Sequence, residues 1–146
     1  MVAISLAALA LTAFYTSVGQ ALRMAYTSHD SAVAAQVLQQ RLDSLRRVAP
    51  WTDLTSSAGV TSVLSTASPI PAGSIAGTET ISVAPYPANG SFYVVSRAPN
   101  GTVTFSGSPL AATEQCVQVT VQYSWTNLNR LPVTRRLSTV LTKGGI

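Results

Sequence analysis

The first segment of the chain constrains its fold most, because residues 1–22 contain no charged side chain. The segment reads MVAISLAALALTAFYTSVGQAL, and the first charge along the chain is Arg23. About 20 apolar residues in a helix cross a bilayer core roughly 30 Å thick, and the alanine and leucine content favours a helix. Charged residues make up only 10% of the chain, whereas about 25% is usual in soluble domains. We therefore predict an apolar helix that is covered by lipid or by other helices.

Three other interpretations of this segment remain open, namely a buried core helix, a cleaved signal peptide and a simple signal anchor. A core helix seldom runs this long without a charge, and a signal peptide has a basic start and a shorter apolar run. Small residues that allow membrane helices to approach closely recur on one helical face, at Ala3, Ala7 and Ala10. Together with Phe14 and Tyr15, they are the candidate residues of an assembly helix.

A second helical pattern follows directly, but it has only one apolar side. Neither proline nor glycine occurs from Thr27 to Val48. Apolar residues recur in steps of three and four, which places them on one stripe of a helix. The stripe consists of Val33, Ala34, Val37, Leu38, Leu42, Leu45 and Val48. With Pro50 as a helix stop, residues 1–48 are predicted to form one helix about 70 Å long, at ~1.5 Å per residue. A kink or break near residues 26–30 is the alternative.

The chain after this helix has patterns typical of β-strands. Residues 52–77 are rich in serine, threonine, alanine, glycine and proline, which predicts a loop with one short strand around Val60–Leu64. Further strands are predicted at Thr78–Val83, Phe92–Arg97, Thr102–Ser106, Cys116–Trp125 and Val133–Thr142. The fourth of these alternates strictly between apolar and polar residues, so one of its faces is dry and the other wet. The link from residue 126 to 132 carries two asparagines and a proline and predicts a hairpin.

An antiparallel sheet with one apolar face needs a cover, and the apolar stripe of the helix can supply it. The fold is therefore predicted to be α+β, with a long N-terminal helix whose second half packs on an antiparallel β-sheet. The expected helix–sheet contacts are Val37, Leu38, Leu42 and Leu45 on the helix and Val119, Val121, Tyr123 and Leu137 on the sheet. The chain divides into an apolar half-helix (1–25), an amphipathic half-helix (26–50) and a β-rich domain (51–146).

These features together resemble the type IV pilin and pseudopilin family. The start MVAISLAALALTAF is similar to the run that follows the cleavage and methylation motif of prepilins. The stretch QVLQQRLDSLRRVAPWTDL resembles the helix end and the aromatic–Asp loop of minor pilins, and VQVTVQYSW with RRLSTVLTKGG resembles their terminal hairpin. The basic leader, the cleavage glycine and the nearby glutamate of prepilins do not occur in the sequence. The resemblance implies that they lie just upstream of Met1, and the alternative is a truncated or divergent member of the family.

The resemblance implies a structural subunit, in particular a minor pilin, of a type IV pilus or of a type II secretion pseudopilus. Residues 1–25 would span the cytoplasmic membrane once and later bundle with the helices of other pilin subunits in the filament core. Residues 51–146 would lie outside the cytoplasm, on the filament or cell surface. The alternative from another class is a monomeric, membrane-anchored binding or adhesion module.

No catalytic, cofactor or metal site is expected from the residue pattern. His29 is the one histidine, and the five acidic residues are scattered along the chain. Cys116 is the one cysteine, so no intrachain disulfide can form, and it is expected to be a small buried hydrophobe. Trp51 is expected to plug the first loop rather than to contact a ligand. No phosphate loop or nucleophile motif occurs, so neither an enzyme nor a small-molecule substrate is predicted.

Basic residues gather near the end of the chain, whose formal net charge is +4. Arg130, Arg135, Arg136 and Lys143 are expected to form a basic cluster on the last hairpin. A solvated face or a subunit contact is the first interpretation of this cluster. A contact with DNA is the alternative, because phosphate binding needs lysine or arginine and some minor pilins bind DNA during uptake. A secreted substrate is a further candidate partner.

Overall fold

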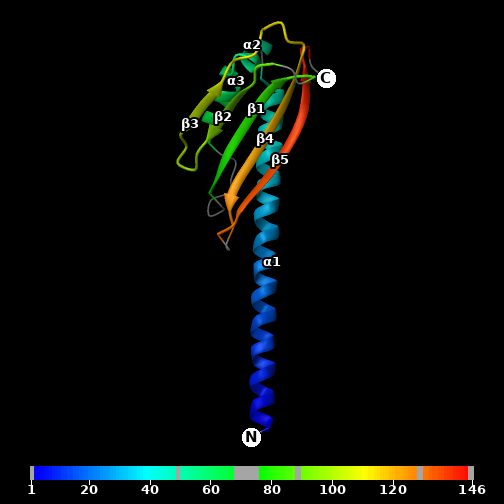
Figure 1. Ribbon diagram of the computed structural model, residues 1–146, viewed down its shortest axis with the longest axis vertical. Coiled ribbons are helices and arrows are strands. Elements are labelled where there is room, and N and C mark those ends of the chain that lie inside the picture. Colours follow the sequence, from blue (N-terminus) through cyan, green and yellow to red (C-terminus); the bar gives the residue numbers. More distant parts are fainter. Residues whose placement is uncertain (1, 49, 68–75, 88–89, 128–129, 145–146) are drawn as a thin grey trace.

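The protein is a long helix joined to a five-stranded antiparallel sheet, so the predicted α+β class is confirmed (Figure 1). The computed structural model describes residues 2–48, 50–67, 76–87, 90–127 and 130–144, with the backbone alone for residues 2–8. The helices are α1 (Val2–Arg46), α2 (Trp51–Thr55) and α3 (Ala58–Ser65). The strands are β1 (Gly77–Pro85), β2 (Tyr93–Arg97), β3 (Val103–Gly107), β4 (Cys116–Thr126) and β5 (Pro132–Thr142).

Helix α1 is continuous over 45 residues, a length of about 68 Å at ~1.5 Å per residue. The alternative of a break near residues 26–30 is wrong, because the helix passes through that region without interruption. It ends at Arg46, two residues before the predicted end. The next two amides, of Arg47 and Val48, bond three residues back to the carbonyls of Ser44 and Leu45 at 3.2 and 3.1 Å. Such tight last turns satisfy carbonyls at a helix end.

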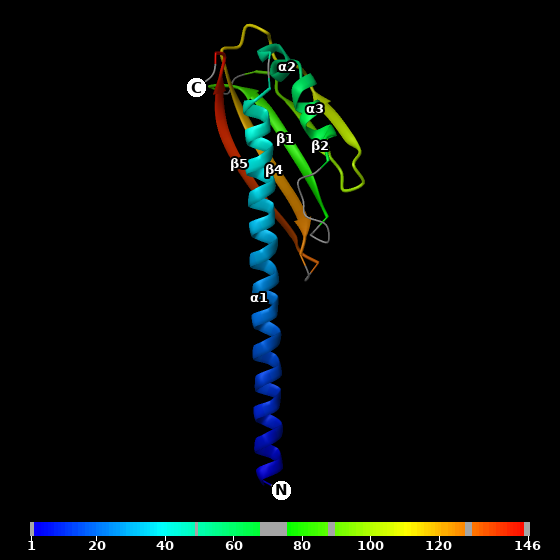
Figure 2. The same cartoon turned by 180° about the vertical axis from the view of Figure 1, so that it is seen from behind.

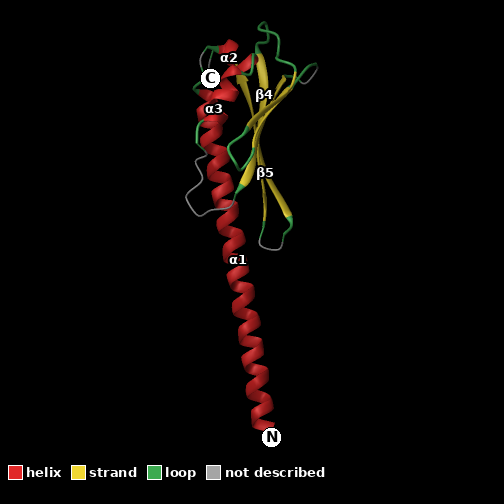
Figure 3. Ribbon diagram, turned by 90° about the vertical axis from the view of Figure 1, so that its left-hand side faces the viewer, coloured by secondary structure: helices red, strands yellow, loops and turns green. Residues whose placement is uncertain are grey.

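The five strands lie in the order β3-β2-β1-β4-β5, and every neighbouring pair is antiparallel. The five strands predicted between Thr78 and Thr142 are all confirmed, with ends that differ by at most two residues. All three helices lie on the same face of the sheet, with α1 over β4 and β5 and with α2 and α3 towards β2 and β3 (Figures 2 and 3). The opposite face carries serine, threonine and glutamine on the central strands, and none of the described helices lies over it (Figure 3).

The prediction for residues 52–77 is wrong in one respect, because two short helices occupy most of the described part of this stretch. The residues assigned to a strand, Val60–Leu64, lie within α3. Val60 and Leu64 are one helical turn apart and both are fully buried, which is the spacing of a helix face. The many serines and threonines, which favour turns when considered one by one, hid this short periodicity.

The core lies between the helices and the covered face of the sheet. It contains most of the apolar stripe of α1, from Ala34 to Leu45, together with Leu54 of α2, two residues of α3 and the inward side chains of the strands. Full burial of one large apolar side chain contributes roughly 1.5–3 kcal/mol, so this stripe is the main attachment of α1 to the sheet. Trp51 packs against the core and its indole Nε1 donates to the carbonyl of Glu114 at 2.9 Å. It therefore acts as the predicted plug.

Candidate assembly surface

The first half of α1 extends away from the sheet (Figures 1 and 3). It exposes large apolar side chains. Phe14 is 63% exposed and Tyr15 is 71% exposed. The other exposed large apolar residues of this half are Leu9, Leu11, Val18, Leu22, Met24 and Tyr26. From Leu9 onwards, where the side chains are described, the first buried one is that of Asp30. Residues 9–29 therefore form a rod with apolar groups on all its sides, and we call this segment the free half of α1.

The three threonine hydroxyls on the free half are satisfied within the helix itself. The hydroxyl of Thr16 donates to the carbonyl of Thr12 at 2.7 Å, and the hydroxyl of Thr12 donates to the carbonyl of Leu9 at 3.0 Å. Thr27 bonds in the same way to the carbonyl of Arg23 at 2.9 Å. Hydroxyls bonded back to the preceding turn need no water, so these three threonines can be placed in apolar surroundings at little cost.

The predicted assembly residues fall on the free half where the structure describes them. The side chains of Ala10, Phe14 and Tyr15 are exposed, and the two aromatic rings meet edge to face with centroids 6.2 Å apart. Ala3 and Ala7 belong to α1, but their side chains lie outside the described residues. Within the part of the chain that the structure describes, no helix has both the length and the apolar character of a membrane-crossing segment.

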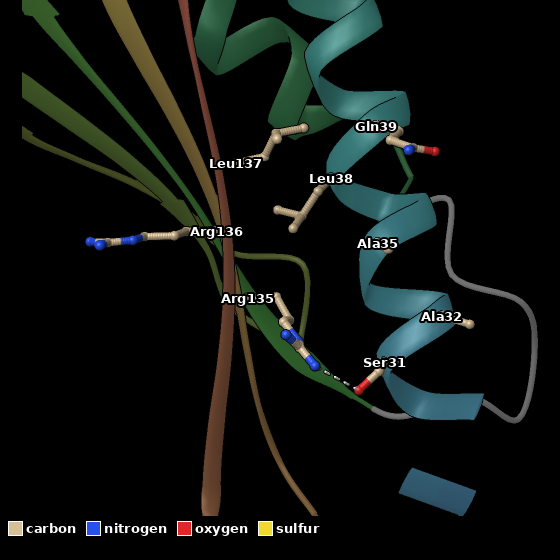
Figure 4. Close-up of a pocket in the computed structure, with 8 residues that line it drawn as sticks. All are labelled: Ser31, Ala32, Ala35, Leu38, Gln39, Arg135, Arg136 and Leu137. Carbon is tan, nitrogen blue, oxygen red and sulfur yellow. Dashed lines mark hydrogen bonds between the residues drawn. The ribbon is translucent and has the colours of Figure 1, made fainter. Parts of the chain in front are cut away.

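The predicted helix–sheet contacts are present with one exception. Seven of the eight residues belong to the core: Val37, Leu38, Leu42, Leu45, Val119, Val121 and Tyr123. Leu137 is opposite Val121 in the β4–β5 register and faces α1, but it remains 36% exposed (Figure 4). The prediction of a packed Leu137 is wrong because β5 is an edge strand and α1 does not cover it fully.

A buried charge network between α1 and the sheet was not predicted. Arg41 and Glu79 are 4% and 3% exposed, and Arg41 Nε lies 2.5 Å from Glu79 Oε2. The other Glu79 oxygen lies 3.5 Å from Nη1 of Arg97. Arg41 also donates to the carbonyl of Val63 at 2.6 Å and to the hydroxyl of Thr66 at 2.9 Å. One guanidinium therefore ties α1 to β1 and to the end of α3.

Two signals in the sequence could have revealed this network. Arg41 is four residues after Val37 and four before Leu45, so it lies on the apolar stripe. Glu79 alternates with Ile81 and therefore lies on the covered face of β1. A cation and an anion on facing apolar surfaces indicate a buried pair, because an unpaired buried charge is very costly.

Two core tyrosines have raised pKa values because they are buried. Burial raises the pKa of Tyr123 to about 12, and the negative charges of Glu79 and Asp30 add to this effect. Burial also raises the pKa of Tyr93 well above its ordinary value. The hydroxyl of Tyr93 donates a short hydrogen bond to the carbonyl of Leu54 in α2. Both hydroxyls are therefore structural groups in the neutral form.

The four basic residues predicted to form one cluster do not come together. Arg135 and Arg136 are consecutive on β5 and so point to opposite faces, Arg135 towards α1 and Arg136 away from it (Figure 4). Arg130 precedes β5 and Lys143 follows it, and the eleven residues between the strand's ends extend over about 37 Å at ~3.4 Å per residue. The expected polyanion-binding cluster on the last hairpin is therefore wrong.

The structure instead brings Arg135 to the surface of α1. Its guanidinium donates to the hydroxyl of Ser31 at 3.4 Å. Two adjoining hollows lie between α1 and β5 on either side of this contact. The apolar one, of about 420 Å³, includes Ala35, Leu38 and Leu137 (Figure 4). The other, of about 500 Å³, includes the last turns of the free half of α1 and is lined by Arg23, Met24, Thr27, Ser28, Ser31 and Arg135. We call the second hollow the basic groove.

The remaining chemistry-bearing residues are separated from one another. His29 is exposed on α1, and Cys116 is only partly buried at the start of β4, contrary to the prediction that it is buried. Among the residues that the structure describes, no group of three or more metal-ligating side chains occurs. Comparisons with protein-family models, with curated proteins and with solved structures found no match to this chain.

Proposed function

We propose that this protein is a structural subunit of a filament, a minor pilin of a type IV pilus or of a type II secretion pseudopilus. The observation that carries the proposal is the free half of α1, which exposes apolar side chains on all sides of a helix whose other half is fixed to a sheet. Large exposed apolar surfaces mark interaction sites with proteins or membranes. A rod attached to a compact head is suited to bundle through the rod and to display the head.

Helix–helix packing supports this role for the free half. Alanine and glycine at its surface, such as Ala10 and Gly19, let neighbouring helices approach closely. The threonine hydroxyls that bond back to their own helix can enter a shared apolar bundle without losing a partner. Phe14 and Tyr15 provide large contact areas of the kind that dominates interface energetics.

Before assembly, the same helix half would hold the subunit in the cytoplasmic membrane, with the sheet domain outside the cytoplasm. The 22 residues that precede Arg23 rise about 33 Å at ~1.5 Å per residue, against a hydrocarbon core of roughly 30 Å. The membrane stage and the filament stage use the same apolar surface, first against lipid and then against other copies of the chain.

The test is self-association of the full chain in membranes, measured by cross-linking and by sedimentation of filaments. Phe14→Lys places a charge on the free half and should abolish association while leaving the near-ultraviolet circular dichroism of the core unchanged. Phe92→Lys is the matched control, because Phe92 is similarly exposed, at 58%, but belongs to the sheet domain. It should associate like the original chain.

One result would reject the filament role, and another would reject the free half of α1 as its contact surface. If the original chain stays monomeric at every density in the membrane, the protein is an anchored binding or adhesion module. If Phe92→Lys reduces association as much as Phe14→Lys does, the contact surface is not the free half of α1.

A further inference from the structure

The basic groove combines two positive charges with several hydroxyls. Arg23 comes from α1 and Arg135 from β5, although 112 positions separate them in the sequence. Ser28 and Ser31 contribute hydroxyls from adjacent turns of α1, whereas the hydroxyl of Thr27, which also lines the groove, already donates to the carbonyl of Arg23. Arginine presents a planar fork of donors that matches phosphate oxygens, and hydroxyls can bond the oxygens that remain. The groove therefore has the donor set of a phosphate site.

Neither arginine of the groove has an acidic partner among the residues that the structure describes. Among the described side chains, the ion pairs involve Arg41, Arg46 and Arg97, and neither arginine of the groove takes part in one. The nearest acidic residue along α1 is Asp30, which is buried and acts on Tyr123 in the core. The positive charge of the groove is thus available to an external anion.

The groove lies at the end of the sheet domain that is closest to the free half of α1. The end of β4 and the start of β5 lie at this same end of the sheet (Figures 1 and 3). Leu131 directly precedes β5 and is 58% exposed, and Tyr26 of the free half is 56% exposed. Exposed tyrosine, leucine and arginine side chains are typical of the boundary between hydrocarbon and water.

We propose that the basic groove binds the phosphate of an anionic phospholipid while the subunit is in the membrane. This inference rests on the proposed function, because it requires the free half of α1 to be in lipid. A lipid is favoured over a free phosphate ion because the groove opens directly onto an apolar surface. Met24 lines the groove, and Leu22, one position before Arg23, is exposed and can contact an acyl chain.

The experiment titrates the full chain, in a neutral detergent, with short-chain phosphatidylglycerol, short-chain phosphatidylcholine and inorganic phosphate. The double variant Arg23→Gln/Arg135→Gln removes both guanidiniums of the groove. The double variant Arg47→Gln/Arg136→Gln is the matched control, because it removes the same charge from an exposed helix end and from the opposite face of β5. Circular dichroism checks that every variant is folded.

The original chain should prefer phosphatidylglycerol to phosphatidylcholine, and inorganic phosphate should compete only weakly. Each arginine near an anionic lipid surface contributes roughly fivefold in affinity, so the groove variant should lose about 25-fold. The control variant should lose about twofold or less by the same reasoning. An equal loss in both variants would mean that the lipid senses only net charge, and strong competition by inorganic phosphate would mean an ion site rather than a lipid site. Either result overturns the proposal.

The groove and the filament role can fail separately. If the original chain shows no preference for phosphatidylglycerol but still self-associates through Phe14, only the lipid site is rejected. If the preference is present and confined to the groove while the chain never self-associates, the lipid site stands and the filament role is rejected.

Discussion

Replacing Glu79 by leucine tests whether the buried charge network holds α1 on the sheet. In the variant, the guanidinium of Arg41 would keep its bonds to the carbonyls of Val63, Thr66 and Ala67. It would lose the carboxylate at 2.5 Å while only 4% of its side chain is exposed. Removal of one partner from a buried ion pair costs about 3–5 kcal/mol. Because domains of this size are stable by about 5–15 kcal/mol, the loss would be easy to measure.

A double-mutant cycle separates the charge effect from the loss of packing. Arg41→Met alone should also be destabilising, since it leaves Glu79 buried with only the more distant Arg97 at 3.5 Å. With both changes, no uncompensated charge remains between Arg41 and Glu79. The carbonyls of Thr66 and Ala67 that lose their donor belong to exposed residues, which water can reach. The double variant should therefore lose clearly less than the sum of the two single losses.

The free energy of unfolding is measured for the full chain by urea titration, with tryptophan fluorescence as the signal. Trp125 is buried in the core and Trp51 packs against it, so both report on the helix–sheet contact. A loss below about 1 kcal/mol for Glu79→Leu, which is the range of exposed pairs, would refute the reasoning. Strict additivity in the cycle would refute it as well.

The two core tyrosines give further predictions. The folded-state pKa of Tyr123 is raised from 10.0 to about 12, so its contribution to stability is complete below pH 10 and is lost as the pH rises towards 12. The unfolding free energy should therefore fall between pH 10 and 12, and less steeply in Tyr123→Phe, as checked by urea titrations across this pH range. Tyr93→Phe removes the donor to the buried carbonyl of Leu54 and should cost about 1–3 kcal/mol at neutral pH. A cost near zero in the same assay would mean that water replaces the hydroxyl.

The sequence predicts the sheet and the long helix well because their patterns are local. In β4, alternation from Val117 to Trp125 is strict, and every apolar member is buried. The steps of three and four along α1 likewise identify its buried stripe, and the core contains almost all of it. When one face of a helix or strand packs against another element, its apolar residues recur at a fixed period. This period is the strongest signal of secondary structure in a short segment.

The errors have two physical origins. Short helices rich in small polar residues, such as α3, carry too few apolar positions for a clear period. Contacts between distant segments, such as Arg41 with Glu79, depend on which faces of the helix and the sheet meet. A local pattern shows that each residue lies on an apolar face, but it does not show that the two residues are partners. The prediction of a basic cluster was wrong for a simpler reason, because consecutive residues on a strand, such as Arg135 and Arg136, point to opposite faces. For the candidate site, the exposed apolar helix was predictable from residues 1–22, whereas the basic groove was not.

Because the free half of α1 lies outside the core, selection for folding and selection for assembly should act on different residues of this chain. Side chains from Leu9 to Leu22 make no contribution to the packing of the sheet domain, since nearly all of them are exposed. Substitutions there should have no effect in a screen that selects for folding or solubility of the sheet domain. They should have an effect only in a screen that selects for assembly through the free half of α1. A comparison of the two screens would outline the interface residue by residue without any structure of the complex.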